Sequence, residues 1–377
     1  MLIYPTNRRF FIMKTIASAP NHSPIRPFSL QKFVLSRLKF PNSATIHYLC
    51  AMKNLIDLFV ALGLRLQDTT NDPALRQIVE NACHENPWFT PHEVHRAIRS
   101  LAEQMLLRTK LEAWVGAYPL PVKTPKRVLV IMAGNIPLVG FFDLLCVVIS
   151  GHFCYVKPSS KDRILMEYIV RLLLEIDPEA PVRIYNEQNE IDALIATGSD
   201  NAARYFKTHY KGIPTLLRGS RQSIAVLTGN ETPQQMEGLA DDIWAYSGLG
   251  CRNVSLIFAP RGCRVELKMP ETNPKLRNNY LQTRAILRLN NQAFTDLGAS
   301  VLVEGNRFPK ALSQVVVSYY DDLEQVEQWI ATNDQALQCI VTNALTHNRQ
   351  VGFGKAQSPR LTDYPDERDV CRWLTDI

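Results

Sequence analysis

Between residues 127 and 210 the chain alternates short apolar runs with amphipathic stretches. Runs such as RVLVIMAG are almost entirely apolar over the length of a strand, which is typical of strands buried on both faces of a parallel sheet. Stretches such as DRILMEYIVRLLLEI space their apolar residues by three and four, which predicts helices. The alternation favours a doubly wound α/β sheet of the nucleotide-binding type, in which ligands bind at the carboxyl ends of the strands. The expected strands lie in RVLVIMAG, CYVK, VRIYN, IDALIATGS and TLLRGSR, and the expected helices cover PLVGFFDLLCVVIS, DRILMEYIVRLLLEI and NAARYFKTHY.

The segment that precedes this sheet is rich in helix signals. NLIDLFVALGLRL has the helical spacing of apolar residues, and TPHEVHRAIRSLAEQMLL opens with a helix start. Thr90 is a favourable N-cap residue, Pro91 suits the first helical position, and Glu93 completes a capping box. The proline-rich stretch YPLPVKTPKR then marks a connector before the sheet.

The pattern after residue 220 predicts a second α/β region. We interpret NVSLIFAPRG, ILRLN, ASVLVEG and SQVVVSYY as strands and DLEQVEQWIATN as a helix. A chain of 377 residues exceeds one compact core and suits two or three domains. We expect an atypical basic extension over 1–51, a helical and nucleotide-binding region over 52–220, a catalytic domain over 221–345 and a C-terminal tail over 346–377.

The formal net charge of +6 is concentrated at the N-terminus. Residues 1–50 contain seven Lys or Arg and no Asp or Glu, so the remainder has a net charge of −1 (6 − 7). We therefore expect no basic face for nucleic acid. The extension has three interpretations, namely sequence appended before a natural start at Met52, a disordered segment, or a targeting leader. The most apolar stretch, residues 136–149, contains Asp143, which argues against an integral membrane segment.

The eight cysteines include no C-x-x-C pair and no paired Cys/His ligand spacing, which argues against structural zinc. His92 and His95 are spaced as i and i+3 at an expected helix start, without a third ligand nearby in the sequence. No metal site is therefore predicted. A disulfide framework is not expected in a chain of this length, and the composition suits a reducing cytoplasm.

Candidate chemistry lies in the loops that follow the expected strands. AGNIP, KPSS and TGS combine small residues with a directed polar group, namely Asn135, Lys157 and Ser199. No G-x-G-x-x-G fingerprint occurs, so a dinucleotide phosphate would have to be held in another way. In WAYSGLGCRNVS, Cys251 directly follows a turn that is poor in side chains. A thiol in that position has the accessibility that a nucleophile needs.

These motifs together resemble the aldehyde dehydrogenase superfamily. VLVIMAGNIPLVGFFDLLCVVISGHFCYVKPSSKD is similar to that superfamily's strand, oxyanion loop, helix and lysine strand, ATGSDNAARYF resembles its F-T-G-S segment, and SGLGCRNVS resembles its G-x-x-C nucleophile motif. Within the superfamily, AGNIPLVGFFD, GSRQSIAVLTGNE, LADDIWAYSGLGCRNVS and GFGKAQSPRLTDYPDE look most like the fatty acyl-CoA reductases, the group that includes the reductase of bacterial luminescence. The resemblance runs from Met52 to the end. It implies an aldehyde-dehydrogenase-like α/β fold, with a non-standard Rossmann nucleotide-binding domain and an α/β catalytic domain.

The resemblance also implies roles for individual residues. Cys251 takes the place of the nucleophile, and Asn135 takes the place of the amide that binds the developing oxyanion together with a backbone N–H of the cysteine loop. We expect Gly248 and Gly250 to leave space for the substrate carbonyl and the nicotinamide. An electropositive setting is expected to lower the pKa of the thiol, with Arg252 as one source of positive charge. The residues expected to bind the cofactor are Lys157, Ser160, Gly198 and Ser199.

Three positions depart from the superfamily pattern. Leu217 stands where oxidising members carry the glutamate that activates water, so the pattern favours reduction of a thioester over hydrolysis. Ser160 replaces a glutamate that holds the adenosine ribose in NAD-preferring members, which favours NADPH and leaves NADH possible. Lys310 lies near the position of a glutamate that holds the nicotinamide ribose, so contacts from that side cannot be carried over.

The sequence therefore predicts an NADPH-dependent reductase that converts an acyl-CoA, with a fatty acyl group favoured, to an aldehyde through a Cys251 acyl-enzyme. Two alternatives remain open at this stage. One is a cysteine-dependent acyltransferase or thioesterase without redox chemistry, and the other is an inert nucleotide- or acyl-binding protein on the same fold. The expected partner is the acyl-CoA substrate, with a homo-oligomer possible and the cytoplasm as the expected location.

Overall fold

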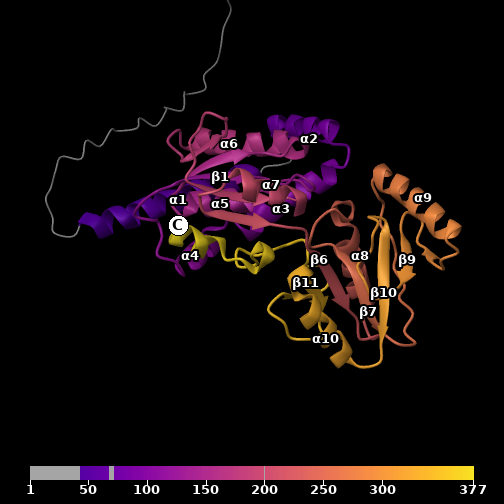
Figure 1. The fold of residues 1–377 in the computed structure, drawn as a ribbon. Coiled ribbons are helices and arrows are strands. Elements are labelled where there is room, and N and C mark those ends of the chain that lie inside the picture. The colour runs from indigo at the N-terminus through magenta and orange to yellow at the C-terminus, as the bar shows by residue number, and fades with distance from the viewer. Residues whose placement is uncertain (1–42, 68–71, 199) are drawn as a thin grey trace, which may run out of the picture. The chain divides into compact units, whose positions relative to one another are not determined.

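Two β-sheets organise residues 44–377, which form one compact unit (Figure 1). The computed structural model describes residues 43–67, 72–198 and 200–377. The expected extension over 1–51 lies outside the described residues as far as residue 42, and α1 (Ser43–Gln67) begins within its remainder. Within the described ranges, no helix combines the length and apolar character needed to cross a membrane.

The first sheet has five parallel strands in the order β3-β2-β1-β4-β5. The chain winds outward from β1 to β3 and then returns to the other side of β1, which creates a switch point between β1 and β4 where ligands bind in such sheets. Each strand coincides with an apolar run in the sequence, and the middle residues of β1 are buried because helices cover both faces. The strands are β1 (Arg127–Ile131), β2 (Phe153–Lys157), β3 (Val182–Ile184), β4 (Ala193–Thr197) and β5 (Thr215–Arg218).

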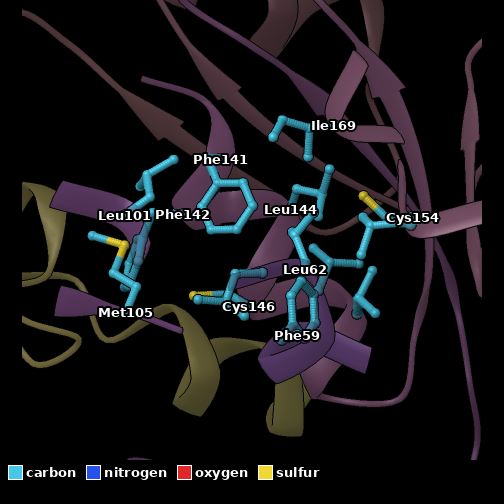
Figure 2. Close-up of a cluster of buried hydrophobic side chains, with 14 of the residues drawn as sticks. Phe59, Leu62, Leu101, Met105, Phe141, Phe142, Leu144, Cys146, Cys154 and Ile169 are labelled. Carbon is cyan, nitrogen blue, oxygen red and sulfur yellow. The ribbon is translucent and has the colours of Figure 1, made fainter. Parts of the chain in front are cut away.

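Helices from the first part of the chain pack around this sheet, and most of them share one core (Figure 2), whereas the helix over 200–209 contributes Phe206 to a separate cluster. The Phe59 and Phe141 rings meet edge to face within it, with centroids 6.4 Å apart. The Thr90 side chain accepts a hydrogen bond from the backbone N–H of Glu93, as the sequence predicted. The helices are α1, α2 (Pro73–Glu85), α3 (Pro91–Gln104), α4 (Arg108–Val115), α5 (Phe141–Ile149), α6 (Arg163–Ile176) and α7 (Asp200–His209).

The second sheet has seven strands in the order β12-β11-β6-β7-β10-β9-β8, and only the β8–β9 pair is antiparallel among them. Apolar clusters cover both faces of its central strands, which explains their continuous apolar runs. The strands are β6 (Gln222–Val226), β7 (Val254–Pro260), β8 (Thr295–Asp296), β9 (Val301–Glu304), β10 (Gln314–Tyr320), β11 (Leu337–Thr342) and β12 (Gln350–Val351), and the helices are α8 (Pro233–Trp244), α9 (Pro274–Leu289) and α10 (Leu323–Asn333).

The predicted strand over ILRLN is wrong, because these residues form the last turn of α9 and its C-cap. The helix starts where Asn273 caps it and proline occupies its first position. Of the apolar residues in the run, Leu287 is buried against β9, whereas Ile286 and Leu289 are exposed. A single buried residue among exposed neighbours suits one face of a helix and does not require a strand.

The C-terminal segment crosses from the second sheet to the helices of the first, as the yellow trace in Figure 1 shows. Tyr364 accepts a hydrogen bond of 2.7 Å from the indole of Trp114, and the hydroxyl of Tyr118 donates to Asp369 at 2.9 Å. The final helix, α11 (Val370–Asp376), then packs against α5. The segment thereby ties both sheets together and brings residues 357–366 to the region between them.

Candidate active site

A cavity of about 860 Å³ opens where loops from both sheets meet. Its wall includes the ends of β1, β4 and β5 from the first sheet, so it lies at the switch point expected for a ligand site. The second sheet contributes the loop that carries Cys251 and the residues around Lys310, and the C-terminal segment contributes residues 357–366. The volume is typical of a pocket for an organic ligand.

The turn before Cys251 has an unusual backbone. Tyr246, Ser247 and Gly248 have φ angles of 54°, 57° and 74°, all in the left-handed region that favours glycine. Strained backbone of this kind persists where the surrounding structure holds it, and it concentrates at functional sites. Here it reverses the chain between the end of α8 and β7, so that Cys251 reaches the cavity wall.

Asn253 holds this turn in place, and sequence reasoning did not identify it. Its buried side chain donates from Nδ2 to the carbonyl oxygens at positions 242, 243 and 245, at 3.2, 3.1 and 2.9 Å. Its Oδ1 accepts a hydrogen bond of 2.7 Å from the N–H of Gly250. One amide therefore satisfies the carbonyls at the end of α8 and at its C-cap, and it fixes the loop three residues before itself. The sequence signal that could have identified Asn253 is its place directly before the buried apolar run of β7.

The two glycines of the turn line the cavity and also serve the loop itself. Gly248 provides a positive φ, and a Cβ at Gly250 would lie 3.0 Å from Oδ1 of Asn253. A side chain at Gly250 would therefore displace the amide that anchors the loop. On the cavity side, an added Cβ at Gly250 would lie near Ile136 and one at Gly248 near Leu312, both at ordinary van der Waals distances.

Cys251 is exposed to the cavity, yet it lies deep within the surrounding protein. Desolvation by this protein mass raises the pKa of its thiol to about 11, the Arg252 charge opposes the rise, and the negative charge of Asp366 adds to it. The expectation of a lowered pKa is therefore wrong, because desolvation outweighs the guanidinium. The Arg252 Nε donates to the carbonyl of Ala356, which holds the charge beside the loop. Near neutral pH the thiol must lose its proton before it can act as a nucleophile.

Asn135 lies on the loop after β1 and lines the same cavity as Cys251. Its Nδ2 donates to the carbonyl oxygen of Leu249 at 2.5 Å, so the two loops are directly joined. An amide nitrogen carries two hydrogens, and the second is available to a ligand. The buried Asp162 accepts the N–H of Leu138 at 2.8 Å, which holds the loop in a conformation with φ of 59° at Leu138.

The residues expected to bind the cofactor lie in different places. Gly198, at the end of β4, lines the cavity, and a Cβ there would lie 2.9 Å from the side chain of Ala202. Ser199 lies outside the described residues. Lys157 and Ser160 are exposed and stand outside the cavity wall, where Lys157 Nζ lies 5.7 Å from the centroid of the Tyr185 ring.

Two neighbours of those residues line the cavity instead. Ser159 and Lys161 flank the exposed Ser160 and form part of the wall. A Cβ at Gly134, on the facing loop, would lie 2.6 Å from the Cβ of Ser159. Lys310, the residue that departs from the superfamily pattern, also lines the cavity. The structure therefore brings Cys251, Asn135 and Gly198 together and leaves Lys157 and Ser160 at the exposed end of β2.

Strand β5 presents Arg218 to the cavity, whereas Leu217 packs into the apolar cluster on the other face of the strand. Arg218 Nη1 donates to Asp143 Oδ2 at 2.6 Å, and both side chains are buried. Within the described residues, Nε and Nη2 of Arg218 and Oδ1 of Asp143 have no hydrogen-bond partner. Because buried polar atoms normally have one, a ligand with an acceptor and a donor fits this wall. The position next to the thiol that we expected for Leu217 is therefore not observed.

The end of α8 also anchors the GFGKA stretch of the C-terminal segment. Asp242 is fully buried and accepts the N–H groups of Gly354 and Ala356 at 2.7 and 2.9 Å. Burial raises the pKa of Asp242 to about 7, against the two N–H donors, which lower it. A Cβ at Gly238 would lie 2.8 Å from the nitrogen of Gly354, so the two backbones approach closely.

Comparisons with known proteins support the resemblance seen in the sequence. Residues 117–268 match the family model described as acyl-CoA reductase (LuxC), a span that contains Asn135, Gly198 and Cys251. The chain is 26% identical over 171 residues to the long-chain acyl-protein thioester reductase of Aliivibrio fischeri, a match that covers 39% of this chain and 35% of that relative. The matched segment thus spans about a third of the relative's length.

Solved structures show the same fold. An oxidoreductase from Marinobacter aquaeolei aligns with a TM-score of 0.61 at 12% identity, over 82% of this chain and 79% of that one. Aldehyde dehydrogenase 21 from Physcomitrella patens aligns with a TM-score of 0.60 at 11% identity, over 86% and 83% of the two chains. The chain therefore has an aldehyde-dehydrogenase-like α/β fold, and its residues 117–268 are similar to the acyl-CoA reductase (LuxC) family, as its motifs predicted.

Proposed function

We propose that this protein reduces a fatty acyl thioester, with CoA as the acyl carrier, to an aldehyde through an acyl-enzyme on Cys251. The observation that carries the proposal is a single cavity that joins a thiol, the Asn135 amide of the loop after β1, and Gly198 at the end of β4. The Aliivibrio fischeri relative is a long-chain acyl-protein thioester reductase, so an acyl-protein is a second acyl carrier to test.

The protein groups of the cavity supply the acyl-transfer half of the reaction. The thiolate of Cys251 attacks the acyl carbonyl, and the second N–H of Asn135 donates to the oxygen that becomes negative. Such a donor contributes about 3 to 4 kcal/mol to the transition state in well-studied enzymes. The unpaired donors of Arg218 and the free oxygen of Asp143 suit the amide groups of the CoA arm.

The residues present also fit a nicotinamide dinucleotide. Gly134 and Gly198 both line the cavity, and they present backbone there because neighbouring side chains, Ser159 and Ala202, occupy the places where a Cβ would lie. The cations of the cavity wall outnumber its carboxylates, which suits a ligand with several phosphates. These cations are Lys161, Arg218, Arg221, Arg252, Lys310 and Arg360, and the carboxylates are Asp143, Asp363 and Asp366. When bound in reduced form, the nucleotide supplies hydride to the acyl carbon.

We propose NADPH as the preferred cofactor. The stretch from Lys157 to Lys161 reads KPSSK and contains two cations and no carboxylate. Ser160 is exposed three residues beyond the end of β2 and outside the cavity wall, so it can donate to a 2′-phosphate that extends past the wall, where a carboxylate would repel that group.

The test is to follow aldehyde and NADPH oxidation with a panel of acyl-CoAs of different length and with an acyl-protein thioester. We expect stoichiometric aldehyde and oxidised cofactor, covalent labelling of Cys251, and loss of both activities in Cys251→Ala, which retains cofactor binding because the thiol lies on the acyl side. A Cys251→Ala protein that still forms aldehyde at a tenth of the parent rate would contradict the assignment of the nucleophile. Release of free acid without cofactor oxidation would instead favour a thioesterase.

A further inference from the structure

The proposed reaction needs a proton acceptor and donor in the cavity. The nucleophile thiol must lose a proton, and a carrier thiolate must gain one. Among the described residues that line the cavity there is no histidine and no glutamate, and the carboxylates are Asp143, Asp363 and Asp366. Asp143 is paired with Arg218 at 2.6 Å. Asp363 accepts hydrogen bonds from the guanidinium of Arg360, at 2.9 Å, and from the backbone N–H of Arg360. Asp366 is also paired, with Arg221 at 3.1 Å, and it is the carboxylate of the three whose charge is among the main influences on the thiol.

Asp366 occupies a strained turn of the C-terminal segment. In the turn η4 (Pro365–Glu367), Asp366 and Glu367 have φ angles of 57° and 55°, although neither is glycine. The N–H of Asp366 donates to Oε1 of Gln338 at 3.3 Å, which ties the turn to β11. Two consecutive left-handed residues are rare, and such strain is retained where the structure needs a group in one place.

The Asp366 carboxylate faces the cavity from a mostly buried position, with 11% of its side chain exposed. Arg221 Nε lies 3.1 Å from Oδ1, and Arg221 is itself fixed by a hydrogen bond of 2.9 Å to the carbonyl of Leu337. Burial raises the pKa of Asp366, while the charges of Arg221, Arg218 and Arg368 and a hydrogen bond from the backbone N–H of Gly219 lower it. The carboxylate is therefore held by the connection between β5 and β6, which joins the two sheets.

Hydrogen bonds and one peptide bond connect the turn that carries Asp366 to the loop that carries Cys251. Gln338, which holds the turn of Asp366, is followed by Cys339, whose N–H donates to the hydroxyl of Ser223 at 3.1 Å. That hydroxyl donates to the carbonyl of Cys251 at 2.9 Å. The negative charge of Asp366 raises the pKa of the Cys251 thiol, so each group lies within the field of the other.

We propose that Asp366 accepts the proton of the Cys251 thiol and delivers it to the departing carrier thiolate, a role that rests on the proposed function. The S–H bond breaks and the proton moves through the cavity to a carboxylate oxygen as the sulfur forms its bond to the acyl carbon. The bond from that carbon to the carrier sulfur then breaks, and the carrier leaves as a thiol with the proton from Asp366.

The same carboxylate serves the reductive half. With the reduced nicotinamide as reductant, a C–H bond forms at the acyl carbon and the bond to the Cys251 sulfur breaks, which releases the aldehyde. The thiolate that remains takes a proton from solvent through Asp366. Each aldehyde therefore consumes one solvent proton, and both the thiol and the carboxylate return to their starting states.

The test compares Asp366→Asn with Glu367→Gln in the full chain. Glu367 is the next residue in the same strained turn, it contacts Asn348 and Arg349, and it lies outside the cavity wall. Iodoacetamide alkylation of Cys251 is followed against pH by peptide mass spectrometry, and formation of the acyl-enzyme from a fatty acyl-CoA is timed. In Asp366→Asn, we expect the alkylation midpoint to move to lower pH, because a negative charge is lost, while acylation near neutral pH slows at least 100-fold.

Those two effects together separate proton transfer from a structural role, because a merely disturbed turn would not favour the thiolate and at the same time slow acylation. Glu367→Gln should match the parent in both measurements, and Asp366→Glu should retain measurable acylation with a changed pH profile. An Asp366→Asn protein with the parent midpoint and an acylation rate within about twofold of the parent would overturn the proposal. Should that variant not fold, the pH profile of Asp366→Glu decides, because an unchanged profile also overturns it. If the parent forms no acyl-enzyme with any thioester, the proposed function fails, whereas the alkylation midpoints still test the coupling of the two groups.

Discussion

Two asparagines form hydrogen bonds with the loop that carries Cys251, and their amides have different roles. Asn135 uses one N–H to join its own loop to Leu249 and keeps the other for a ligand. Asn253 uses its whole amide inside the protein, because it donates to two carbonyls of α8 and to that of the C-cap, and accepts from the N–H of Gly250. A change at the first should therefore act on the reaction, and a change at the second should act on the fold.

We expect Asn135→Ala to slow acylation of Cys251 about 100-fold to 1000-fold, because one oxyanion donor is lost. Asn253→Ala should instead lower the free energy of unfolding by about 1 to 3 kcal/mol, because it leaves buried polar groups unpaired. Acylation kinetics and denaturant unfolding of both proteins check the assignment, with the exposed Asn230→Ala as the control. An Asn135→Ala protein with the parent acylation rate would remove the oxyanion role.

At the scale of elements, the contact between α8 and the GFGKA stretch depends on pH. The pKa of Asp242 is about 7 in the folded protein and close to the ordinary aspartate value of 3.8 when the chain is unfolded. The folded state therefore binds this proton more tightly, so the stabilising contribution of the protonated group is full below about pH 4 and is lost as pH rises through about 7. Above that range the buried carboxylate retains only its two N–H donors.

We expect the unfolding free energy of the parent to fall between about pH 5 and about pH 8 by more than that of Asp242→Asn, because the variant has no proton to lose at this position. Denaturant unfolding of both proteins at both pH values gives the change of unfolding free energy with pH for each. The difference between these two changes cancels the contributions of other titrating groups. Hydrogen exchange at the N–H groups of Gly354 and Ala356 should speed up with pH in the parent beyond the intrinsic rise. Equal slopes in the two proteins would show that Asp242 does not titrate in this range.

The elements that sequence reasoning placed well are those whose signals are local. The apolar runs of β1 and β7 and the Thr90 cap of α3 each occupy a few consecutive residues, and the structure confirms them. ILRLN failed because a run of Leu and Ile suits both a strand and a buried helix face, and only packing against β9 decides.

At the scale of the whole molecule, the cavity also combines features that local sequence signals predict with features that only the packing of distant segments produces. Asn135 and Gly198 were predictable as neighbours because the carboxyl ends of parallel strands meet at one edge of a sheet. Arg218 and Asp143 are 75 positions apart, and their pairing depends on the alternation of β5 and on how α5 packs. Asp366 reaches the cavity only because the C-terminal segment crosses from one sheet to the other. The raised pKa of Cys251 also follows from the protein around it, which neighbouring residues in the sequence do not report.

Cofactor choice is also a property of the whole molecule, because a ligand in the cavity contacts both sheets and should stabilise the folded chain as one unit. At a concentration of about 100 times its Kd, a ligand that binds only the folded state adds about 2.7 kcal/mol to the free energy of unfolding. We therefore expect NADPH to raise the unfolding temperature more than an equal concentration of NADH. Ser160→Glu should reduce the rise with NADPH and spare that with NADH, because a carboxylate at the end of β2 repels a 2′-phosphate. Ser160→Gln, which has the same size without the charge, should stay close to the parent for both nucleotides. Thermal unfolding of the three proteins with each nucleotide gives the answer, and equal rises with NADPH in the Glu and Gln variants would show that charge at residue 160 does not select the cofactor.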